Sequence, residues 1–441
     1  MKKIFTIATI LHLVITTAVA QVEEVSPTTF LMDVDGHELK LPYYFTKPLD
    51  QLDESITQLV ISQHGNNRNA TTYRLSMLTA AVEAGKSEQT LIIAPQFLTR
   101  EDIEEWNLPN DYLFWYNSGW KIGDRSRTNV ASLPRPAQIS SFEAMDQLIM
   151  HVLASGNFPN IKDIVVAGFS AGGQFVNRYA AANLLHNDVK QTYEIDIRYL
   201  AGGPSSFLYM NNERRVVGTT DQFAVPATGC SEYNDYKYGL NSRNNYLNKT
   251  TETIIREQYA TRKILYLVGD QDNNPNASAL DKDCPAMLQG EQRLERSVIY
   301  FNYLKHYYGA EIEDLQQFSI VPDVGHDHNA IFRSTIGSTW IFKNDITTSV
   351  NKLDTQLKQV IYVYPNPVIA NAKLNYYLPN AELVTLKITN LSGTIVQEFA
   401  QNYQQPGNHQ VVWQAQALPK GIYFAVLQTG NKISTTKIIH Q

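Results

Sequence analysis

Residues 168–173 read Gly-Phe-Ser-Ala-Gly-Gly and place Ser170 inside the pattern Gly-x-Ser-x-Gly. The apolar run 164–167, Ile-Val-Val-Ala, is typical of a buried strand and leads directly into this motif, and the stretch 174–182 that follows is helix-like. At a sharp turn from strand to helix, a serine hydroxyl is exposed, and glycines flank it because a Cβ there would clash. The first N–H groups of the helix can also receive an oxyanion. The motif therefore predicts a strand–turn–helix unit with Ser170 as candidate nucleophile.

A serine hydroxyl is a weak nucleophile at neutral pH and needs a base, here a histidine oriented by a carboxylate. In folds with this serine turn, the order along the chain is serine, acid, histidine. Asp270 and Asp272 follow the predicted strand 263–269; we favour Asp272, since the acid usually comes three residues after the strand-end glycine, and keep Asp270 as the alternative. His326 follows the last predicted strand and is the expected base. His328 is the competitor, although it falls at the start of the next helix, where a solvent-facing or capping role is expected.

An oxyanion hole needs two preorganised N–H donors. The backbone of Ala171, directly after the candidate nucleophile, is the expected first donor. The second is expected from the loop after the strand 58–62, where Asn66 or Gly65 would supply it.

Several side chains near these loops are candidates for the substrate pocket. They are His64, Tyr116 and Trp120, with core packing as the alternative for the aromatic residues. Residues 204–246 are long for a simple connection and rich in Tyr and Asn, so we expect them to form a cap over the pocket. A polar cap of this kind favours a sugar ester or an aromatic ester over a long acyl chain.

Short apolar runs alternate with amphipathic stretches from residue 28 to residue 343, which predicts a mostly parallel sheet with helices on both faces. An opening hairpin is expected over 28–34 and 38–45. The expected parallel strands are 58–62, 90–94, 162–167, 194–201, 263–268 and 317–321. The expected helices are 70–84, 140–155, 174–185, 291–308 and 328–343.

The first twenty residues have the pattern of a secretory leader. Lys2 and Lys3 precede the apolar stretch 4–19, and Ala18-Val19-Ala20 forms an A-x-A cleavage site. A membrane-anchoring helix is the alternative, but the stretch is short and no basic cluster follows it. We therefore expect a signal peptide at 1–20 and an exported protein without a transmembrane anchor.

The chain has two cysteines, Cys230 and Cys284, and an even count in an exported protein favours a disulfide. No zinc-binding pattern competes for them. A calcium loop over Asp270 and Asp272 is excluded because Pro275 stands where such a loop needs glycine. We therefore expect no metal and no cofactor. The net charge of −6 gives no electrostatic reason to expect nucleic acid as a partner.

A polar stretch, 346–361, reads as a linker, and residues 362–441 have a different pattern. Short alternating runs separated by turn residues predict a small antiparallel β-sandwich of five to seven strands. The runs are 373–377, 384–388, 409–413, 422–426 and 434–439. The aromatic residues here, Tyr376, Tyr377, Trp413 and Tyr423, favour a sandwich core, with sugar stacking as the alternative.

Taken together, these motifs resemble the α/β-hydrolase superfamily over residues 28–345, and within it a group of secreted hydrolases of bacteria and fungi. The residues that carry the resemblance are His64-Gly65, Arg68-Asn69-Ala70, Ile139-Ser140-Ser141-Phe142, Asp146, Gly168–Gly173, Pro204-Ser205-Ser206, Tyr233-Asn234-Asp235, Tyr238-Gly239-Leu240, Cys284-Pro285-Ala286, Gln289-Gly290 and Arg293-Leu294. The resemblance implies Ser170, Asp272 and His326 as the triad, and a disulfide between Cys230 and Cys284. The chain departs from the pattern at Gly202-Gly203, where a bulkier residue is expected before Pro204.

The last part resembles the C-terminal sorting domains of type IX secretion in Bacteroidetes. The residues that carry it are Tyr364-Pro365-Asn366-Pro367, Leu391-Ser392-Gly393, Gly421-Ile422-Tyr423 and Lys437-Ile438-Ile439. The resemblance implies export through the periplasm, passage across the outer membrane by the type IX machinery and removal of the tail. The mature protein would be released or held at the cell surface.

The sequence therefore predicts a secreted serine hydrolase that acts on a carboxylic ester, either a small molecule or a carbohydrate ester. A secreted serine peptidase with the same triad is one alternative. A surface-displayed binding protein without catalysis is the other.

Overall fold

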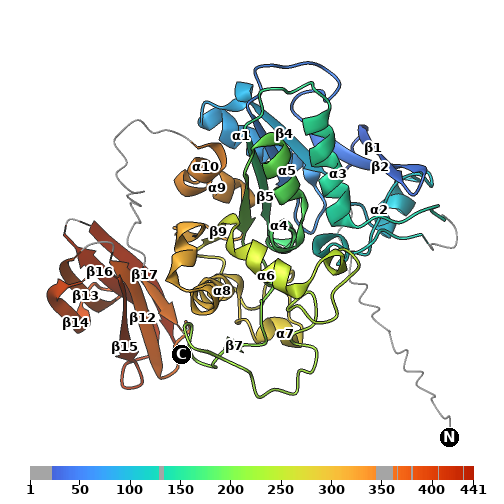
Figure 1. Cartoon of the computed structure of the whole chain (residues 1–441). Coiled ribbons are helices and arrows are strands. Elements are labelled where there is room, and N and C mark those ends of the chain that lie inside the picture. Colours follow the sequence, from blue (N-terminus) through green and yellow to red (C-terminus); the bar gives the residue numbers. More distant parts are fainter. Residues whose placement is uncertain are drawn as a thin grey trace, which may run out of the picture. The chain divides into compact units, whose positions relative to one another are not determined.

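The computed structural model describes residues 22–128, 134–343 and 361–441, apart from 365, 379, 380, 406 and 431. The chain divides into two compact units, an N-terminal unit that ends at Asn344 and a C-terminal unit that starts at Asp345 (Figure 1). The predicted leader at 1–20 and all of the predicted linker except Ile361 lie outside the described residues. None of the described helices combines the length and apolar character that crossing a bilayer requires.

An eight-stranded sheet lies at the centre of the N-terminal unit (Figure 1). Only β2 runs against the other described strands of this sheet, since it pairs antiparallel with both β1 and β4 while the remaining pairs are parallel. This order, with its single reversed strand, is that of the α/β-hydrolase fold and confirms the predicted fold class. In sheet order the strands are β1 (Thr29–Val34), β2 (His37–Phe45), β4 (Thr90–Pro95), β3 (Gln58–Gln63), β5 (Asp163–Phe169), β6 (Ile197–Gly202), β9 (Lys263–Gly269) and β10 (Gln316–Val321).

The sheet is buried on both faces because the residues of its central strands that point to either face are apolar. In β3, Leu59 and Ile61 belong to one core cluster and Val60 to the other. Helices of both cores cover the two faces (Figure 1). One face is covered by α1 (Ala70–Glu83), α9 (His328–Arg333) and α10 (Thr335–Phe342), and the other by α3 (Ser141–Ala154), α4 (Ala171–Ala182), α5 (Leu185–Tyr193), α6 (Glu252–Ala260) and α8 (Arg293–Tyr308).

Two predicted helices differ from the structure. The predicted helix 328–343 is two helices, α9 and α10, because Ser334 is extended at the junction (φ −56°, ψ 150°) and its side chain accepts a hydrogen bond from the Gly337 N–H to cap α10. The predicted helix 174–185 begins earlier, at Ala171, and ends at Ala182. Short elements were not predicted at all: α2 (Arg100–Glu105), α5, α6, α7 (Cys284–Met287) and the four 3₁₀ turns η1 (Ser87–Gln89), η2 (Trp120–Ile122), η3 (Leu247–Lys249) and η4 (Ala310–Asp314).

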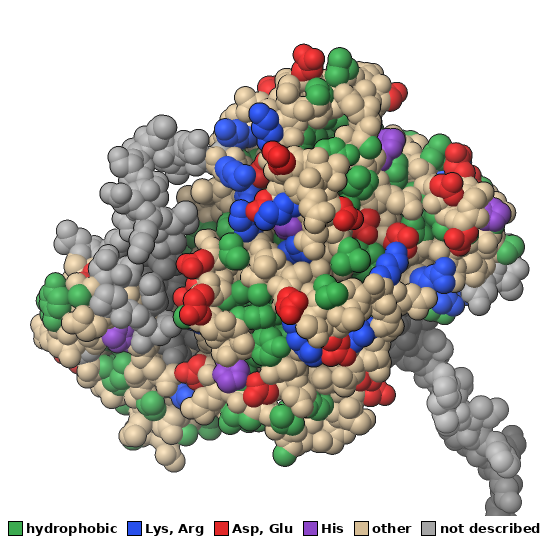
Figure 2. Space-filling model, viewed as in Figure 1, with side chains coloured by type: hydrophobic (Ala, Val, Ile, Leu, Met, Phe, Trp, Pro, Cys, Tyr) green, Lys and Arg blue, Asp and Glu red, His purple; other side chains and the backbone are tan. Residues whose placement is uncertain are grey.

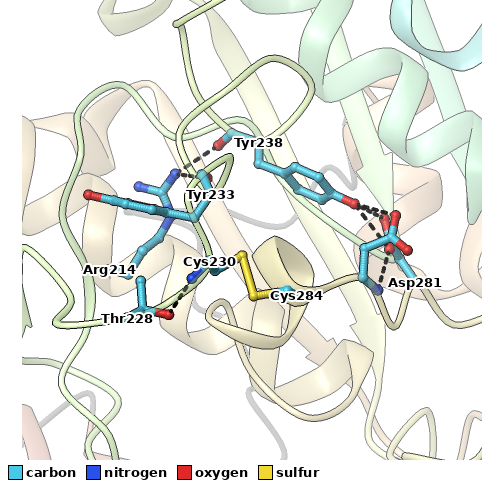
Figure 3. The surroundings of a disulfide bond; sticks show 8 residues. Arg214, Thr228, Cys230, Tyr233, Tyr238, Asp281 and Cys284 are labelled. Atoms are coloured by element: carbon cyan, nitrogen blue, oxygen red, sulfur yellow. Dashed lines mark hydrogen bonds between the residues drawn. A yellow bond between two sulfur atoms is a disulfide. The ribbon is translucent and has the colours of Figure 1, made fainter.

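A long irregular segment follows β6 and contains only the small hairpin β7 (Arg214–Arg215) and β8 (Phe223–Ala224) before residue 246. Cys230 in this segment is bonded to Cys284 at the start of α7 (Figure 3), which confirms the predicted disulfide. The buried Arg214 guanidinium donates to the backbone oxygens of Tyr233 and Tyr238, so the backbone on either side of residue 236 is held as well.

The C-terminal unit packs two antiparallel sheets around one apolar core, as predicted for a sandwich. The first sheet has the order β11-β12-β15 and the second β14-β13-β16-β17. Trp413 and Tyr423 contact each other inside this core, so these two aromatic residues are packing residues. The strands are β11 (Tyr362–Tyr364), β12 (Asn371–Leu378), β13 (Glu382–Asn390), β14 (Ile395–Gln404), β15 (Gly407–Gln414), β16 (Gly421–Thr429) and β17 (Lys432–His440); β11 and β14 were not predicted.

The surface carries charges of both signs. The chain has 37 Lys and Arg against 43 Asp and Glu. On the face of the N-terminal unit in view, Figure 2 shows basic and acidic side chains interspersed, with hydrophobic side chains in several separate groups. This mixed surface is typical of a protein that is folded in water.

Candidate active site

Ser170 lies at the turn between β5 and α4 in a backbone conformation that is rare for serine, with φ 60° and ψ −118°. The glycines around it are required by close backbone contacts. A Cβ on Gly172 would lie 2.4 Å from the Gln63 oxygen, and a Cβ on Gly173 would lie 2.3 Å from the Gly202 oxygen. The motif therefore holds the serine at the carboxyl edge of the sheet, where ligands of open α/β sheets bind.

Three of the predicted site residues are in hydrogen-bond contact at this edge. The Nε2 atom of His326 lies 2.8 Å from the Ser170 Oγ, and its Nδ1 atom lies 2.6 Å from Oδ2 of Asp272. Asp272 is buried, whereas 31% of the His326 side chain is exposed. Since a buried carboxylate accepts from Nδ1–H, Nε2 is left to accept the proton of the serine hydroxyl.

The two alternative residues, Asp270 and His328, make other contacts. An oxygen of Asp270 accepts from the Val324 N–H at 3.2 Å, so this carboxyl braces the loop that carries His326. The ring of His328 stacks on Tyr73 with centroids 4.1 Å apart. Its Nε2 lies 3.1 Å from the Ser76 Oγ, and burial lowers its pKa. His328 thus packs against α1, while His326 faces the serine.

A buried arginine contacts the acid of this group. Nη1 of Arg293 lies 3.5 Å from the Asp272 Oδ1, and both side chains are almost completely buried. The backbone of Asp272 is held as well, because its N–H donates to Gly269 and its oxygen accepts from Leu294. The sequence identified Arg293 as part of a family pattern but not as a neighbour of Asp272, since twenty residues, among them those of α7, separate the two.

The predicted oxyanion donors lie beside Ser170. Ala171 is the first residue of α4, so its N–H has no partner within the helix. Asn66 lines the same cavity as Ser170 and Ala171, whereas Gly65 packs against the Tyr73 hydroxyl, which would lie 2.6 Å from an added Cβ. Arg68, buried against Asp102, donates at 2.9 Å to the Asn66 oxygen and holds this loop.

Two of the predicted pocket residues lie in the core instead. His64 is fully buried: its Nε2 accepts from the Phe97 N–H, its Nδ1 donates to the Gly65 oxygen, and burial lowers its pKa to about 3. Trp120 is also fully buried and packs on His64 with ring centroids 4.5 Å apart. The pocket assignment was therefore wrong for both residues. Burial of the large Trp120 ring is favourable, and both ring nitrogens of His64 find hydrogen-bond partners in the interior. Tyr116, the third candidate, does line the cavity and is 59% exposed.

The cavity over Ser170 has a volume of about 580 Å³ and a strongly polar wall. Among the described residues that line it, only Ala171, Ala279 and Leu280 have aliphatic side chains. The others are Asn66, Tyr116, Asn117, Ser118, Lys121, Ser170, Gln174, Ser205, Lys237, Ser278, Asp281, Lys282 and Asp283. The predicted cap segment 204–246 contributes Ser205 and Lys237 to this wall.

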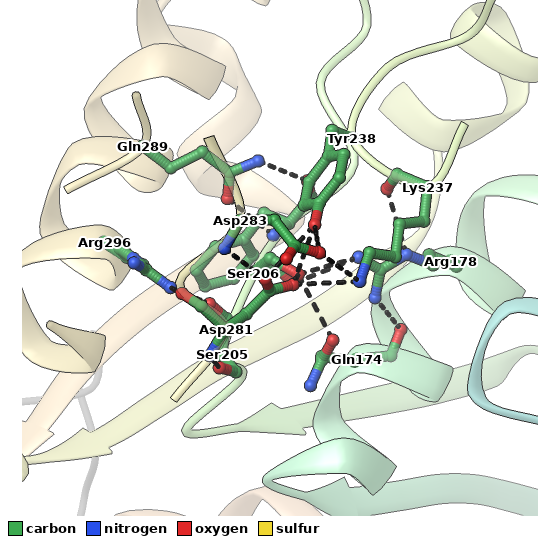
Figure 4. Close-up of polar contacts among 11 residues, drawn as sticks. Gln174, Arg178, Ser205, Ser206, Lys237, Tyr238, Asp281, Asp283, Gln289 and Arg296 are labelled. Atoms are coloured by element: carbon green, nitrogen blue, oxygen red, sulfur yellow. Dashed lines mark hydrogen bonds and ion pairs between the residues drawn. The ribbon is translucent and has the colours of Figure 1, made fainter. Parts of the chain in front are cut away.

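Asp281 is the centre of the hydrogen-bond network in one wall of the cavity (Figure 4). Its carboxylate pairs with the ammonium of Lys237 at 3.0 Å and accepts from the hydroxyls of Tyr238 and Ser206. Behind it, the buried Arg178 donates to the Ser206 hydroxyl at 3.1 Å. This wall is therefore built from matched charges and satisfied donors, and sequence reasoning did not find it because its members come from four separate segments.

Among curated proteins, no sequence matches the chain. Of solved structures, the chain is similar to poly(aspartic acid) hydrolase-1 from Sphingomonas sp. KT-1, with 20% identity and a TM-score of 0.45 over 72% of this chain and 99% of the other. It is also similar to LpqC, a poly(3-hydroxybutyrate) depolymerase from Bordetella parapertussis, with 20% identity and a TM-score of 0.46 over 72% and 90% of the two chains.

The C-terminal unit matches a family model. Residues 362–441 match the secretion system C-terminal sorting domain. The chain is also similar to PorZ, a bacterial surface component of the type IX secretion system of Porphyromonas gingivalis. The identity is 17% and the TM-score 0.15, over 22% of this chain and 12% of PorZ. The chain thus joins a unit with the α/β-hydrolase fold to a unit that matches a secretion system C-terminal sorting domain.

Proposed function

We propose that the N-terminal unit is a serine hydrolase that cleaves carboxylic esters through an acyl-enzyme intermediate. The observation that carries the proposal is the continuous hydrogen-bonded series from Asp272 through His326 to Ser170. A carboxylate, an imidazole and a hydroxyl in this order activate the hydroxyl as a nucleophile.

In the first half-reaction, the Ser170 oxygen attacks the ester carbonyl while Nε2 of His326 takes the hydroxyl proton. Asp272 accepts from Nδ1–H and stabilises the imidazolium that forms. The N–H groups of Ala171 and Asn66 donate to the oxyanion of the tetrahedral intermediate. The imidazolium then gives its proton to the departing alcohol, and the acyl group remains on Ser170.

In the second half-reaction, His326 takes a proton from a water molecule that attacks the acyl carbon. Collapse of the second tetrahedral intermediate breaks the bond to Ser170 and returns the proton to its oxygen. The free acid leaves, and the enzyme is restored.

The wall of the cavity supports a small polar ester as substrate. A long acyl chain would have to displace water from Asn, Ser, Lys and Asp side chains without replacing their hydrogen bonds. A sugar ester or a substituted aromatic ester offers hydroxyl or carbonyl groups to the same side chains. A peptide bond can react with the same three residues, so peptide substrates belong in the same screen.

The site of action follows from the sorting domain. We propose that the leader at 1–20 carries the chain into the periplasm and that the C-terminal unit then presents it to the type IX machinery. The hydrolase unit would act outside the cell, either released or attached to its surface.

Labelling with a fluorophosphonate probe tests the nucleophile directly. The purified wild-type protein should be labelled, and Ser170→Ala should lose the labelling completely, because the probe phosphonylates only an activated serine. Ser278→Ala is the matched control, since Ser278 is an exposed serine that lines the same cavity. It should be labelled like the wild type.

Labelling that persists in Ser170→Ala would contradict the proposal, as would a folded wild-type protein that takes up no probe. A folded wild-type protein without labelling would instead favour the alternative of a surface binding protein without catalysis. A screen of short acyl, acetylated sugar and aromatic esters beside peptide substrates then defines the bond; faster turnover of peptides would favour the peptidase.

A further inference from the structure

Lys121 is a charged residue of the cavity wall that the proposed mechanism does not use. It is half-buried and lines the same cavity as Ser170 and Ala171. Among the described residues, no hydrogen bond or ion pair is formed by its ammonium group. A charged group that is withdrawn from water without a partner costs free energy, which a ligand of opposite charge would recover.

The backbone around Lys121 is held in place by its neighbours. Trp120 is buried, and its oxygen accepts from the Ser141 hydroxyl at 2.7 Å. The oxygen of Ile122 accepts from the Tyr236 hydroxyl at 2.5 Å and from the Asn244 amide at 2.9 Å. The lysine is therefore presented from a fixed turn, η2, which makes it a preorganised contact for whatever enters the cavity.

The other charges of the cavity wall leave Lys121 in positive surroundings. Asp281 and Asp283 lie 3.0 Å and 3.8 Å from the ammonium of Lys237, and Asp281 is further bound by hydroxyls (Figure 4). Burial, together with the positive charges of Lys237 and Arg178, lowers the pKa of Lys121 to about 8, and the negative charges of Asp281 and Asp283 oppose this shift only in part. An anion beside Lys121 would offset this repulsion.

We propose that Lys121 binds a carboxylate of the substrate, so that the enzyme prefers esters whose acyl or alcohol part is itself an acid. This inference rests on the proposed ester hydrolysis at Ser170 and narrows its substrate class. Lys121 is a specificity residue here: it contacts the substrate away from the bond that is cleaved.

Matched pairs of esters test the preference on each side of the bond. For the alcohol side, the pair is para-acetoxybenzoate and its methyl ester. For the acyl side, the pair is mono-(para-nitrophenyl) terephthalate and its methyl ester. The members of a pair differ in one negative charge, and the para geometry prevents the carboxylate from attacking its own ester.

In at least one pair, the wild type should turn over the charged member with a kcat/KM roughly 10-fold or more above the neutral one, as expected for a charge-assisted hydrogen bond. Lys121→Met should remove this preference, and Lys121→Arg should retain most of it. Lys282→Met is the matched control, because Lys282 lines the same cavity but is exposed. It should keep the preference.

Two results would overturn the inference. One is a wild type that turns over neutral and charged members equally, which leaves the proposed ester hydrolysis standing. The other is an equal loss of preference in Lys121→Met and Lys282→Met, which points to long-range attraction and not to a contact. A wild type that hydrolyses no ester at all would contradict the proposed ester hydrolysis itself, and with it this inference.

Discussion

Asp270 and Asp272 lie two residues apart on one loop, yet only the carboxylate of Asp272 contacts His326. Asp272→Asn should lower kcat by roughly 10³–10⁴-fold, because an amide no longer favours the tautomer that leaves Nε2 free to accept a proton. Asp270→Asn should cost less than about 10-fold, since its amide oxygen can still accept from the Val324 N–H. Steady-state kinetics on one ester, with circular dichroism as the check on folding, compares the two variants. An equal loss of kcat in the two variants would contradict the assignment of Asp272 as the acid.

At the scale of single residues, the order and spacing of motifs predicted more than composition could. Ser170, Asp272 and His326 could be placed together because each follows a strand of a parallel sheet, and the carboxyl ends of such strands meet at one edge. The pocket wall could not be placed in this way. Trp120 and Lys121 are adjacent in the sequence, and only the packing of η2 decides that Trp120 is buried while Lys121 lines the cavity.

At the scale of elements, Asp146 joins α3 to α4 and to the segment before α6. Its two carboxyl oxygens accept from the Tyr179 and Tyr246 hydroxyls, each at 2.6 Å. Burial raises the pKa of Asp146 to about 7, so the folded state holds a proton that the unfolded state has already lost. This contribution to stability is complete below about pH 4 and is lost as the pH rises to about 7.

Asp146→Asn should therefore become more stable relative to the wild type as the pH rises from 5 to 8. The expected gain in the free energy of unfolding is on the order of 2 kcal/mol, because the variant stays neutral throughout. Urea unfolding of both proteins at several pH values measures it. Glu143→Gln, on the same helix, controls for the removal of a carboxylate. A difference between Asp146→Asn and the wild type that does not change with pH would rule out the buried proton.

The bounds of helices and strands with a regular hydrophobic pattern and clear turn residues were predicted to within a few residues. The bounds of the other elements were not. In α9 and α10, one apolar pattern runs through Ser334, so the break is set by the capping of α10 by Ser334 and not by hydrophobicity. In β14, polar residues interrupt the run Ile395–Gln404, and this strand lies at the edge of its sheet, where one side needs no partner. Short helices such as α6 depend on tertiary packing more than on their own propensity.

At the scale of the whole molecule, the chain has two units with separate apolar cores. Separate cores should unfold as separate cooperative transitions. Both cysteines lie in the N-terminal unit, and their bond joins residues 54 positions apart. The C-terminal unit, which has no cysteine, is therefore an internal control for any effect of reduction.

Replacing both cysteines, Cys230→Ser with Cys284→Ser, should destabilise the N-terminal unit alone. A bond that closes a loop of this length is worth about 4 kcal/mol in the chain-entropy model, because it restricts the unfolded chain. Calorimetry should show the transition of the N-terminal unit at a lower temperature and that of the C-terminal unit unchanged. Reductant should shift the wild type in the same way and leave the double variant where it is. A shift of both transitions together would mean that the two units unfold as one. That result would contradict the expectation that their separate cores unfold independently.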